Sequence, residues 1–226
     1  MPLNKSKGNM YPFVSHTWNA VKGKCPHDCS YCYMKDPKYN LREIRLDRKE
    51  FGTDLGEGNF IFVGSSCDMW AWDISTEWIL ETLAHNRKFP KNSYLYQSKN
   101  PQRFQRFYGF YPDNVIFGTT IESDREYPEI YKNAPSIKDR YSGIHAIGKE
   151  DGHRTMITIE PILDFDPEKL IGIIEDIEPE WVNIGADSQN CGLPEPGPEK
   201  IEEFILYLED TGIEVKTKAN LKRLML

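Results

Sequence analysis

Three of the chain's five cysteines stand in one short segment, Gly23-Lys24-Cys25-Pro26-His27-Asp28-Cys29-Ser30-Tyr31-Cys32-Tyr33. Their spacing is C-x3-C-x2-C. Thiolates are soft ligands that suit iron–sulfur clusters and zinc. Three of them on one loop can hold a cubane cluster and leave one of its irons without a protein ligand. The segment therefore predicts a metal centre with an open coordination position.

A structural zinc ion, with His27 or His16 as its fourth ligand, is the alternative interpretation. Structural zinc sites usually combine two separated pairs of ligands that close a tetrahedron. The sequence offers no second pair, because Cys67 and Cys191 stand without a partner at ligand spacing. An odd number of cysteines, three of them crowded together, is also unlike a secreted disulfide framework and predicts a reducing, cytoplasmic location.

The composition predicts a single domain that spans residues 1–226. The chain has 226 residues, of which 39% are hydrophobic, and a formal net charge of −7. Such an acidic chain lacks the positive field that indiscriminate binding to nucleic acid or to an anionic membrane requires. No apolar run reaches the roughly 18 residues that span a bilayer, and the first residues lack the apolar stretch of a signal peptide. We therefore expect no membrane association.

Beyond the cysteines, short apolar runs alternate with amphipathic segments. The runs do not alternate cleanly with polar residues, which is typical of strands buried on both faces; they cover residues 14–21, 59–64, 93–97, 115–121, 155–159, 181–184 and 213–216. Helices are expected at residues 75–88, 100–107, 128–132, 138–147, 166–177 and 198–210. This order predicts an α/β fold, a partial (β/α)6-type TIM barrel with room for an extra C-terminal strand, whose chemistry lies beyond the carboxyl ends of the strands.

Further segments make the chain resemble the radical S-adenosylmethionine (SAM) superfamily. A C-x3-C-x2-C motif after a first strand, with an aromatic residue before the third cysteine, is the pattern of that superfamily. The chain is similar to the phage-associated radical SAM family of unknown function and, more distantly, to the spore photoproduct lyase group. The resemblance covers roughly residues 14–220 and rests on TWN at 17–19, IFVGSSCD at 61–68, QSKNPQRF at 97–104, GTTIE at 118–122, APSIKDR at 134–140 and IEPIL at 159–163.

The resemblance implies a radical SAM core domain in which Cys25, Cys29 and Cys32 hold a [4Fe–4S] cluster. It implies that the fourth iron binds SAM through its amino and carboxylate groups, and that an electron from the cluster cleaves SAM to a 5′-deoxyadenosyl radical. This radical would abstract hydrogen from a substrate. A flavodoxin- or ferredoxin-like reducing partner is also implied. The substrate is not identified, and a nucleic acid or nucleotide is favoured only by analogy with the lyase group.

The ends of the second and third predicted strands are expected to bind the amino acid part of SAM. Gly64, Ser65, Ser66 and Cys67 follow the second strand, and the resemblance places the last of these near the SAM amino acid, where serine is usual. The lyase group has a hydrogen-donating cysteine where this chain has Ser65, so Cys67 is a candidate catalytic donor; a small buried thiol is the alternative. By resemblance Lys99 pairs with the SAM carboxylate, and a solvated lysine is the alternative.

The next two strand ends supply three more candidates. Thr120 and Glu122 can accept the ribose hydroxyls, which the resemblance supports. Glu160 lies at the expected barrel mouth, where a carboxylate needs a partner. It is a candidate for contact with SAM or for catalysis on the substrate, and an ion pair with Arg140 or Lys99 is the alternative.

Aromatic residues near the motif have two interpretations each. Tyr31 could pack on the cluster or on adenine, and the backbone of Tyr33 could contact the adenine edge, while core packing is the alternative for both. Trp18, Trp70 and Trp72 could stack on a base or belong to the core. A second class of function also stays open, namely a non-catalytic iron–sulfur or zinc-binding module on the same fold.

Overall fold

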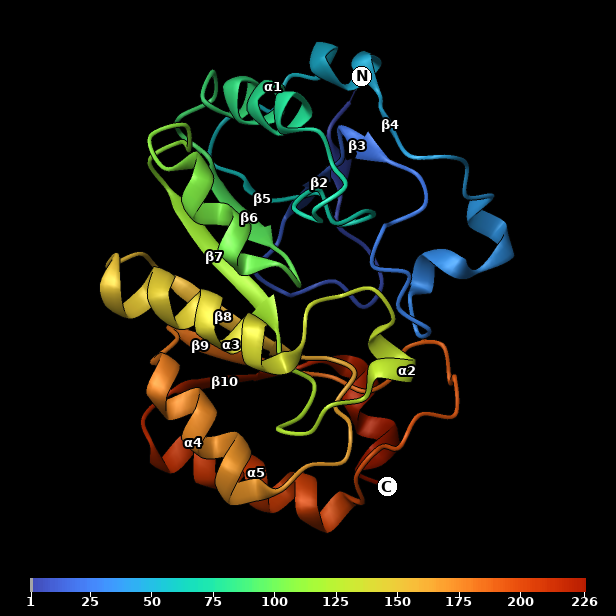
Figure 1. Cartoon of the computed structure of the whole chain (residues 1–226), viewed down its shortest axis with the longest axis vertical. Coiled ribbons are helices and arrows are strands. Elements are labelled where there is room, and N and C mark those ends of the chain that lie inside the picture. The colour runs from blue at the N-terminus through green and yellow to red at the C-terminus, as the bar shows by residue number, and fades with distance from the viewer. Residues whose placement is uncertain (1) are drawn as a thin grey trace.

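The structure is a computed structural model that describes residues 2–226, and one mainly parallel sheet forms its centre (Figure 1). Seven strands run parallel in chain order, and a short N-terminal strand pairs antiparallel with the first of them. The strands of this sheet are β1 (Asn4–Lys5), β2 (His16–Trp18), β5 (Phe60–Val63), β6 (Ser93–Gln97), β7 (Val115–Thr120), β8 (Thr155–Ile159), β9 (Trp181–Ile184) and β10 (Glu214–Thr217). A separate antiparallel pair consists of β3 (Val21–Lys22) and β4 (Arg45–Leu46).

The sheet confirms the predicted partial barrel. Six of its parallel strands match the predicted ones, and β10 is the extra C-terminal strand. The barrel does not close, because β1 and β10 are the two edges of the sheet. The predicted strand at residues 14–21 is wrong in its extent. It divides into β2 and β3, since the chain leaves the main sheet after Trp18 and pairs Val21 with Leu46.

Five α-helices follow strands of the sheet: α1 (Thr76–Asn86), α2 (Pro128–Tyr131), α3 (Ile137–His145), α4 (Pro167–Ile177) and α5 (Pro198–Asp210). Ser75, Ser136 and Asp166 are the N-cap residues directly before α1, α3 and α4, and each side chain accepts a hydrogen bond from a backbone N–H of the first turn. The other helical segments are 3-10 turns at Tyr33–Lys35, Pro37–Tyr39, Arg48–Gly52, Pro101–Phe107 and Ala219–Leu224, and a π turn at Ala146–Glu150. Within residues 2–226 no helix combines the length and apolar character that crossing a bilayer requires.

The inside of the barrel is apolar near the amino ends of the strands. Leu95, Ile116, Met156 and Trp181 form a buried cluster there with Tyr11 of the N-terminal segment. This segment therefore fills part of the space that a closed barrel would enclose. The residues of β8 are buried on both faces, because helices cover the outer side while this cluster covers the inner one.

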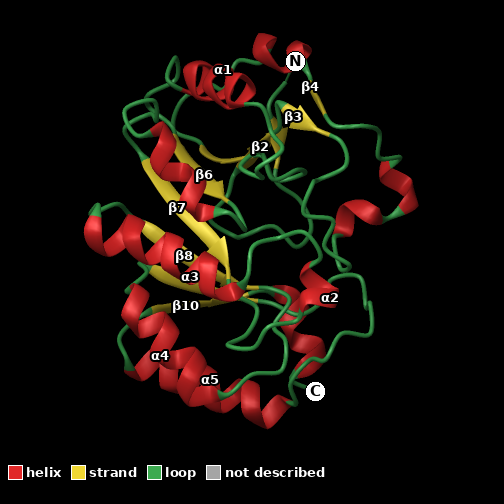
Figure 2. Ribbon diagram, viewed as in Figure 1, coloured by secondary structure: helices red, strands yellow, loops and turns green. Residues whose placement is uncertain are grey.

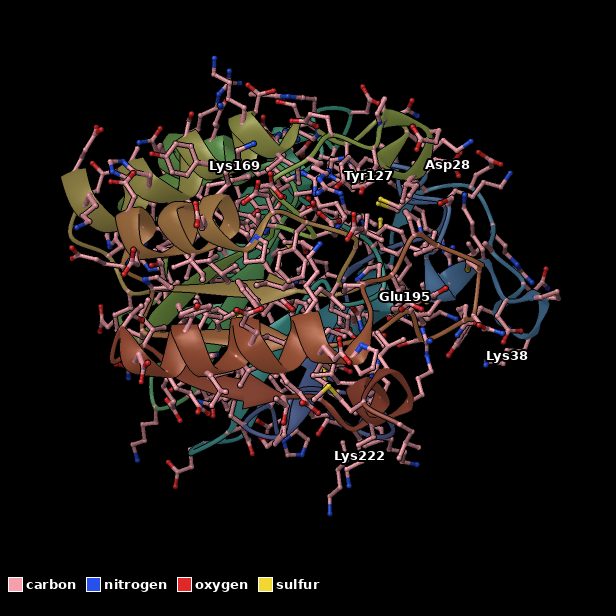
Figure 3. All side chains as sticks on the ribbon, turned by 90° about the horizontal axis from the view of Figure 1, so that it is seen from below. Asp28, Lys38, Tyr127, Lys169, Glu195 and Lys222 are labelled. Carbon is pink, nitrogen blue, oxygen red and sulfur yellow. The ribbon has the colours of Figure 1, made fainter. Side chains whose placement is uncertain are left out.

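Toward the carboxyl ends the inside becomes polar. The strand register places Thr120, Thr158, Asn183 and Lys216 in one row. Side chains two residues further along a strand point to the same face, so Glu160 stands in the next row. Long loops follow these strand ends (Figure 2). Tyr127 in the loop after β7 and Glu195 in the loop after β9 lie in the same half of Figure 3 as Asp28 of the cysteine loop, which follows β3. The fold thus gathers polar strand ends and the cysteine loop on one side.

Candidate active site

The three motif cysteines share one loop that begins directly after β3. The N–H of Cys32 donates to the Cys29 carbonyl (3.3 Å), which folds the loop back on itself. The N–H of Ser30 donates to the carbonyl of Ile130 in α2 (2.9 Å) and ties the loop to the rest of the fold. Cys29 is buried, whereas Cys25 and Cys32 are partly exposed. One anchored segment therefore presents all three thiols.

A buried His–Asp pair fastens this loop to the ends of β5 and β6. His27 Nε2 lies 2.9 Å from Asp68 Oδ2, which also accepts hydrogen bonds from the Ser98 hydroxyl (2.8 Å) and the Lys99 N–H (2.9 Å). Burial works to raise the pKa of Asp68, but His27 holds it below its usual value. Burial works to lower the pKa of His27, and Asp68 raises it above its usual value. No local sequence pattern links these residues, so the pair was not predictable.

Cys67 lies against the first motif cysteine. A hydrogen bond between the two thiols lowers the pKa of Cys25, although burial opposes this. Cys67 is buried, and its N–H donates to the Gly64 carbonyl (3.3 Å) in a tight turn. Gly64 has φ +82°, a conformation that favours glycine, and an added Cβ would lie 3.3 Å from the Cys67 carbonyl oxygen. No other cysteine stands at ligand spacing from Cys67 in the sequence, but the fold brings Cys67 next to Cys25.

The serines after β5 are held beside the cysteine loop. Asn19 Oδ1 accepts hydrogen bonds from the Ser65 hydroxyl (3.2 Å) and the Ser66 N–H (3.0 Å). The Tyr33 hydroxyl donates to the Ser65 carbonyl (2.9 Å). Since Tyr33 directly follows the third motif cysteine, this bond joins the loop to the end of β5. Three residues predicted to bind SAM therefore lie together.

Glu122 forms a buried charge network just beyond β7. Its Oε1 accepts hydrogen bonds from Lys99 Nζ (3.0 Å) and from the Tyr31 hydroxyl, and its Oε2 accepts from Arg140 Nη1 (2.7 Å). Arg140 also donates to the Thr120 carbonyl (3.2 Å). Burial works to raise the pKa of Glu122, but Arg140 and Lys99 hold it below its usual value. The predicted contact of Glu122 with ribose stays a prediction, and its carboxylate already has these partners.

Lys99 and Arg140 also influence the pKa of Cys29, the second cysteine of the motif. Burial raises the pKa of the Cys29 thiol to about 11, while the charges of Lys99 and Arg140 oppose that rise. Two cations face one carboxylate in this network, so a net positive charge remains beside the thiol. Positive charge of this kind stabilises thiolates and any anionic group that they bind.

Glu160 has partners other than Arg140 and Lys99, so the alternative interpretation of an ion pair with one of these cations is wrong. Its Oε2 lies 2.6 Å from Lys218 Nζ. Its Oε1 accepts hydrogen bonds from the side-chain amides of Asn9 (2.8 Å) and Asn220 (3.1 Å). The two expected cations belong to Glu122 instead, because β7 carries that carboxylate toward α3.

The three thiols of the cysteine loop fit an iron–sulfur cluster better than a single metal ion. Within residues 2–226, no three His, Cys, Asp or Glu side chains are placed to bind a single metal ion. A cubane has a different requirement, since each thiolate binds its own iron and the ligands stand farther apart. Three thiols on one anchored loop, with a positive charge behind Cys29, fit that requirement.

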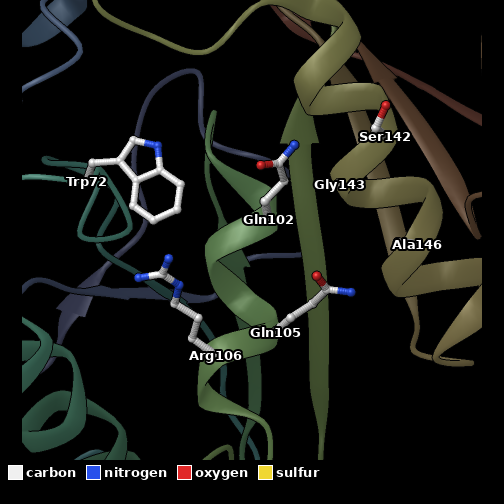
Figure 4. Close-up of a pocket in the computed structure, with 7 residues that line it drawn as sticks. All are labelled: Trp72, Gln102, Gln105, Arg106, Ser142, Gly143 and Ala146. Atoms are coloured by element: carbon white, nitrogen blue, oxygen red, sulfur yellow. The ribbon is translucent and has the colours of Figure 1, made fainter.

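The tryptophans considered for base stacking occupy different environments. Trp18 and Trp70 are fully buried core residues, whereas Trp72 is 50% exposed. Arg106 stacks on Trp72, with its guanidinium carbon 4.7 Å from the ring centroid. Both line a surface pocket of about 540 Å³ between the loop after β5, the 3-10 helix Pro101–Phe107 and α3 (Figure 4). No predicted SAM-binding residue lines this pocket.

Comparison with solved structures finds radical SAM enzymes of similar fold. A cysteine-to-serine mutant of spore photoproduct lyase superposes with a TM-score of 0.66 at 11% identity, covering 93% of this chain and 78% of the lyase chain. Another mutant of that lyase, with bound AdoMet and dinucleoside spore photoproduct, gives a TM-score of 0.64 at 10% identity over 96% of this chain and 80% of the other. A radical SAM methyltransferase from Sphaerobacter thermophilus gives a TM-score of 0.60 at 15% identity over 92% of this chain and 67% of that chain.

These likenesses establish the fold. The chain has the partial barrel of radical SAM enzymes. Within that class it resembles spore photoproduct lyase along most of its length. No protein-family profile and no curated protein sequence matches the chain.

Proposed function

We propose that this protein is a radical SAM enzyme in which Cys25, Cys29 and Cys32 hold a [4Fe–4S] cluster and the fourth iron binds SAM. The observation that carries the proposal is the placement of three thiols on one anchored loop, at the polar end of a radical SAM barrel. A cluster held by these three cysteines would supply the electron for cleavage of SAM to a 5′-deoxyadenosyl radical, which would abstract hydrogen from the substrate.

The protein's own groups hold the cofactor and balance its charge. Lys99 is the proposed partner of the SAM carboxylate: its side chain is 14% exposed and its Nζ lies 3.0 Å from Glu122 Oε1. Ammonium hydrogens beyond that ion pair remain for a ligand. The cations around Glu122 offset the negative charge that thiolates bring to a buried site.

The remaining SAM contacts follow the strand ends. The turn of Gly64, Ser65 and Ser66, with Cys67 beside it, is proposed to bind the amino acid part of SAM. Further contacts are proposed for the ribose and adenine, from Thr120, Glu122, Glu160, Tyr31 and the backbone of Tyr33. Cys67 and Glu160 remain the candidates for hydrogen transfer or substrate contact. The network around Glu122 excludes water from this wall, because the carboxylate and Arg140 are both fully buried.

Substrate and reductant are proposed only by class. The lyase that shares the fold is described with bound dinucleoside spore photoproduct, which favours a nucleic acid or nucleotide substrate here. A flavodoxin- or ferredoxin-like protein would supply the electron. Residues 1–226 are proposed to form one radical SAM core domain.

Release of 5′-deoxyadenosine tests the proposal. Oxygen-free protein, reconstituted with iron and sulfide and given dithionite and SAM, is expected to release 5′-deoxyadenosine and methionine. Cys25→Ala is expected to abolish this release, because one iron loses its ligand. Cys191→Ala removes an exposed cysteine outside the motif and is expected to leave it unchanged. Iron-loaded protein that releases no 5′-deoxyadenosine would instead indicate the non-catalytic module.

A further inference from the structure

One carboxylate links the cysteine loop to the strand end that carries Lys99. Asp68 Oδ2 lies 2.9 Å from His27 Nε2 and accepts a hydrogen bond from the backbone N–H of Lys99 (2.9 Å). His27 stands two residues from Cys25 and two residues from Cys29. A single oxygen atom therefore holds both the loop proposed to bind the cluster and the residue proposed to bind the SAM carboxylate.

The acceptor sites of Asp68 are all occupied by the protein itself. The Ser98 hydroxyl lies 2.8 and 2.9 Å from its two oxygens, and the Trp70 N–H donates to Oδ1 (2.9 Å). Together with His27 and Lys99 these residues supply four donors, which matches the roughly four lone-pair positions of a carboxylate. The Asp68 side chain is also only 12% exposed. Asp68 is therefore suited to position other groups, and not to contact iron or SAM.

A second anchor holds the same stretch of the cysteine loop from the side of α2. The side-chain amide of Asn133 donates to the Pro26 carbonyl (3.1 Å), and its backbone N–H donates to the His27 carbonyl (3.0 Å). Loss of the Asn133 side chain would loosen the loop but leave the bond between Asp68 and Lys99 in place. The two anchors thus allow the stability of the loop to be separated from its position relative to Lys99.

The position of Lys99 matters because SAM would be held at two points. Its ammonium group lies 3.0 Å from Glu122 Oε1, and its backbone is held by Asp68. A ligand that binds an iron and the Lys99 ammonium at once must match the spacing between them. Residues that orient the groups around a metal centre typically change affinity or activity by about 10- to 100-fold when they are replaced.

We propose that Asp68 is a positioning residue that sets the placement of the open iron relative to the Lys99 ammonium, and thereby the affinity for SAM. Its bond to His27 fixes the cysteine loop, and its bond to the Lys99 N–H fixes the end of β6. The inference rests on the proposed function, because it concerns the spacing within the same site.

Calorimetry with SAM tests this role on the cluster-loaded, oxygen-free protein. Asp68→Asn keeps the shape of the side chain but replaces one acceptor oxygen by a donor, so we expect SAM to bind about tenfold more weakly than to the parent. Asn133→Ala is the control and is expected to change the affinity by less than about threefold. Parent affinity in Asp68→Asn, or an equal loss in both variants, overturns the inference.

Electron paramagnetic resonance adds a readout that loop stability alone would not change. Reduced Asp68→Asn is expected to match the parent in iron content and in its signal without SAM. At a SAM concentration near the dissociation constant of the parent, the change in its signal should be smaller. A change as large as that of the parent would overturn the inference.

A milder variant covers the case in which Asp68→Asn does not fold. Ser98→Ala removes one donor from Asp68 and is expected to weaken SAM binding at least about threefold, and parent affinity in this variant overturns the inference. Parent protein that loads iron but binds no SAM would instead overturn the proposed function. The two failures are therefore distinguishable.

Discussion

Two carboxylates stand on neighbouring strands of the barrel, and their surroundings differ. Glu122, beyond β7, is fully buried and bound by two cations and a phenol. Glu160, beyond β8, is partly exposed and bound by one cation and two amides. Around Glu122 the excess charge is positive, whereas beside Glu160 an amide oxygen lacks a donor.

The difference separates two roles. A buried carboxylate with more cations than it needs suits a wall that faces anionic groups such as thiolates and the SAM carboxylate. A partly exposed carboxylate with one cation and two amide donors needs less compensation and suits the rim of the barrel mouth. Substitutions in and around the two carboxylates test this contrast.

Breaking the Glu122 network should cost the most stability. Arg140→Met leaves a fully buried carboxylate with weaker compensation, and we expect a loss of about 3–5 kcal/mol in the free energy of unfolding. Arg154→Met breaks the exposed pair with Glu180 and should cost about 0–1 kcal/mol. Urea unfolding of both variants measures the contrast. Equal losses would show that burial of the first pair has no energetic consequence.

Breaking the Glu160 pair should cost less. Lys218→Met removes a charged hydrogen bond from a carboxylate that is 16% exposed and keeps two amide donors, so we expect a loss of about 1–2 kcal/mol. The same urea experiment provides the measurement. A loss as large as that of Arg140→Met would remove the distinction between the two carboxylates.

The dependence of the free energy of unfolding on pH should also reveal the ionised state of Glu122. Its folded pKa lies below its usual value, so the ionised group stabilises the fold above the unfolded pKa of about 4.3, and this contribution disappears as pH falls through the lower folded pKa. The stability difference between the parent and Glu122→Gln should therefore narrow as pH falls from about 6 to about 3. A difference that stays constant over this range would contradict the lowered pKa.

The smallest effect is expected outside both regions. Trp72 is half exposed and contacts Arg106 on the surface, so Trp72→Ala should change the free energy of unfolding by about 0.5 kcal/mol or less. Release of 5′-deoxyadenosine should be unchanged. A strong loss of release with an intact fold would place the surface pocket in the reaction.

The sequence predicted the strands where apolar runs were long enough to be buried on both faces. It did not predict β1, β3 and β4, because two-residue strands have no periodicity and depend on their pairing partners. It also extended the first strand past Trp18, since apolar character alone does not show that Val21 joins another sheet.

The candidate residues were found at strand ends because the fold class fixes where chemistry lies. Their partners were not found, since they depend on contacts between residues far apart in the chain. The thiol contact of Cys67 with Cys25 and the pairing of Glu160 with Lys218 are of this kind. The register of the strands determines which carboxylate lies beside which cation. This register cannot be read from the composition of the sequence.

Electron paramagnetic resonance of the reduced, oxygen-free protein, recorded with and without SAM and accompanied by metal analysis, tests most directly whether Cys25, Cys29 and Cys32 hold a cluster that binds SAM. We expect about four irons per chain and a [4Fe–4S] signal that changes when SAM is added, because SAM would bind the open iron. Protein that carries zinc in place of iron, or a cluster signal that SAM leaves unchanged, would contradict it.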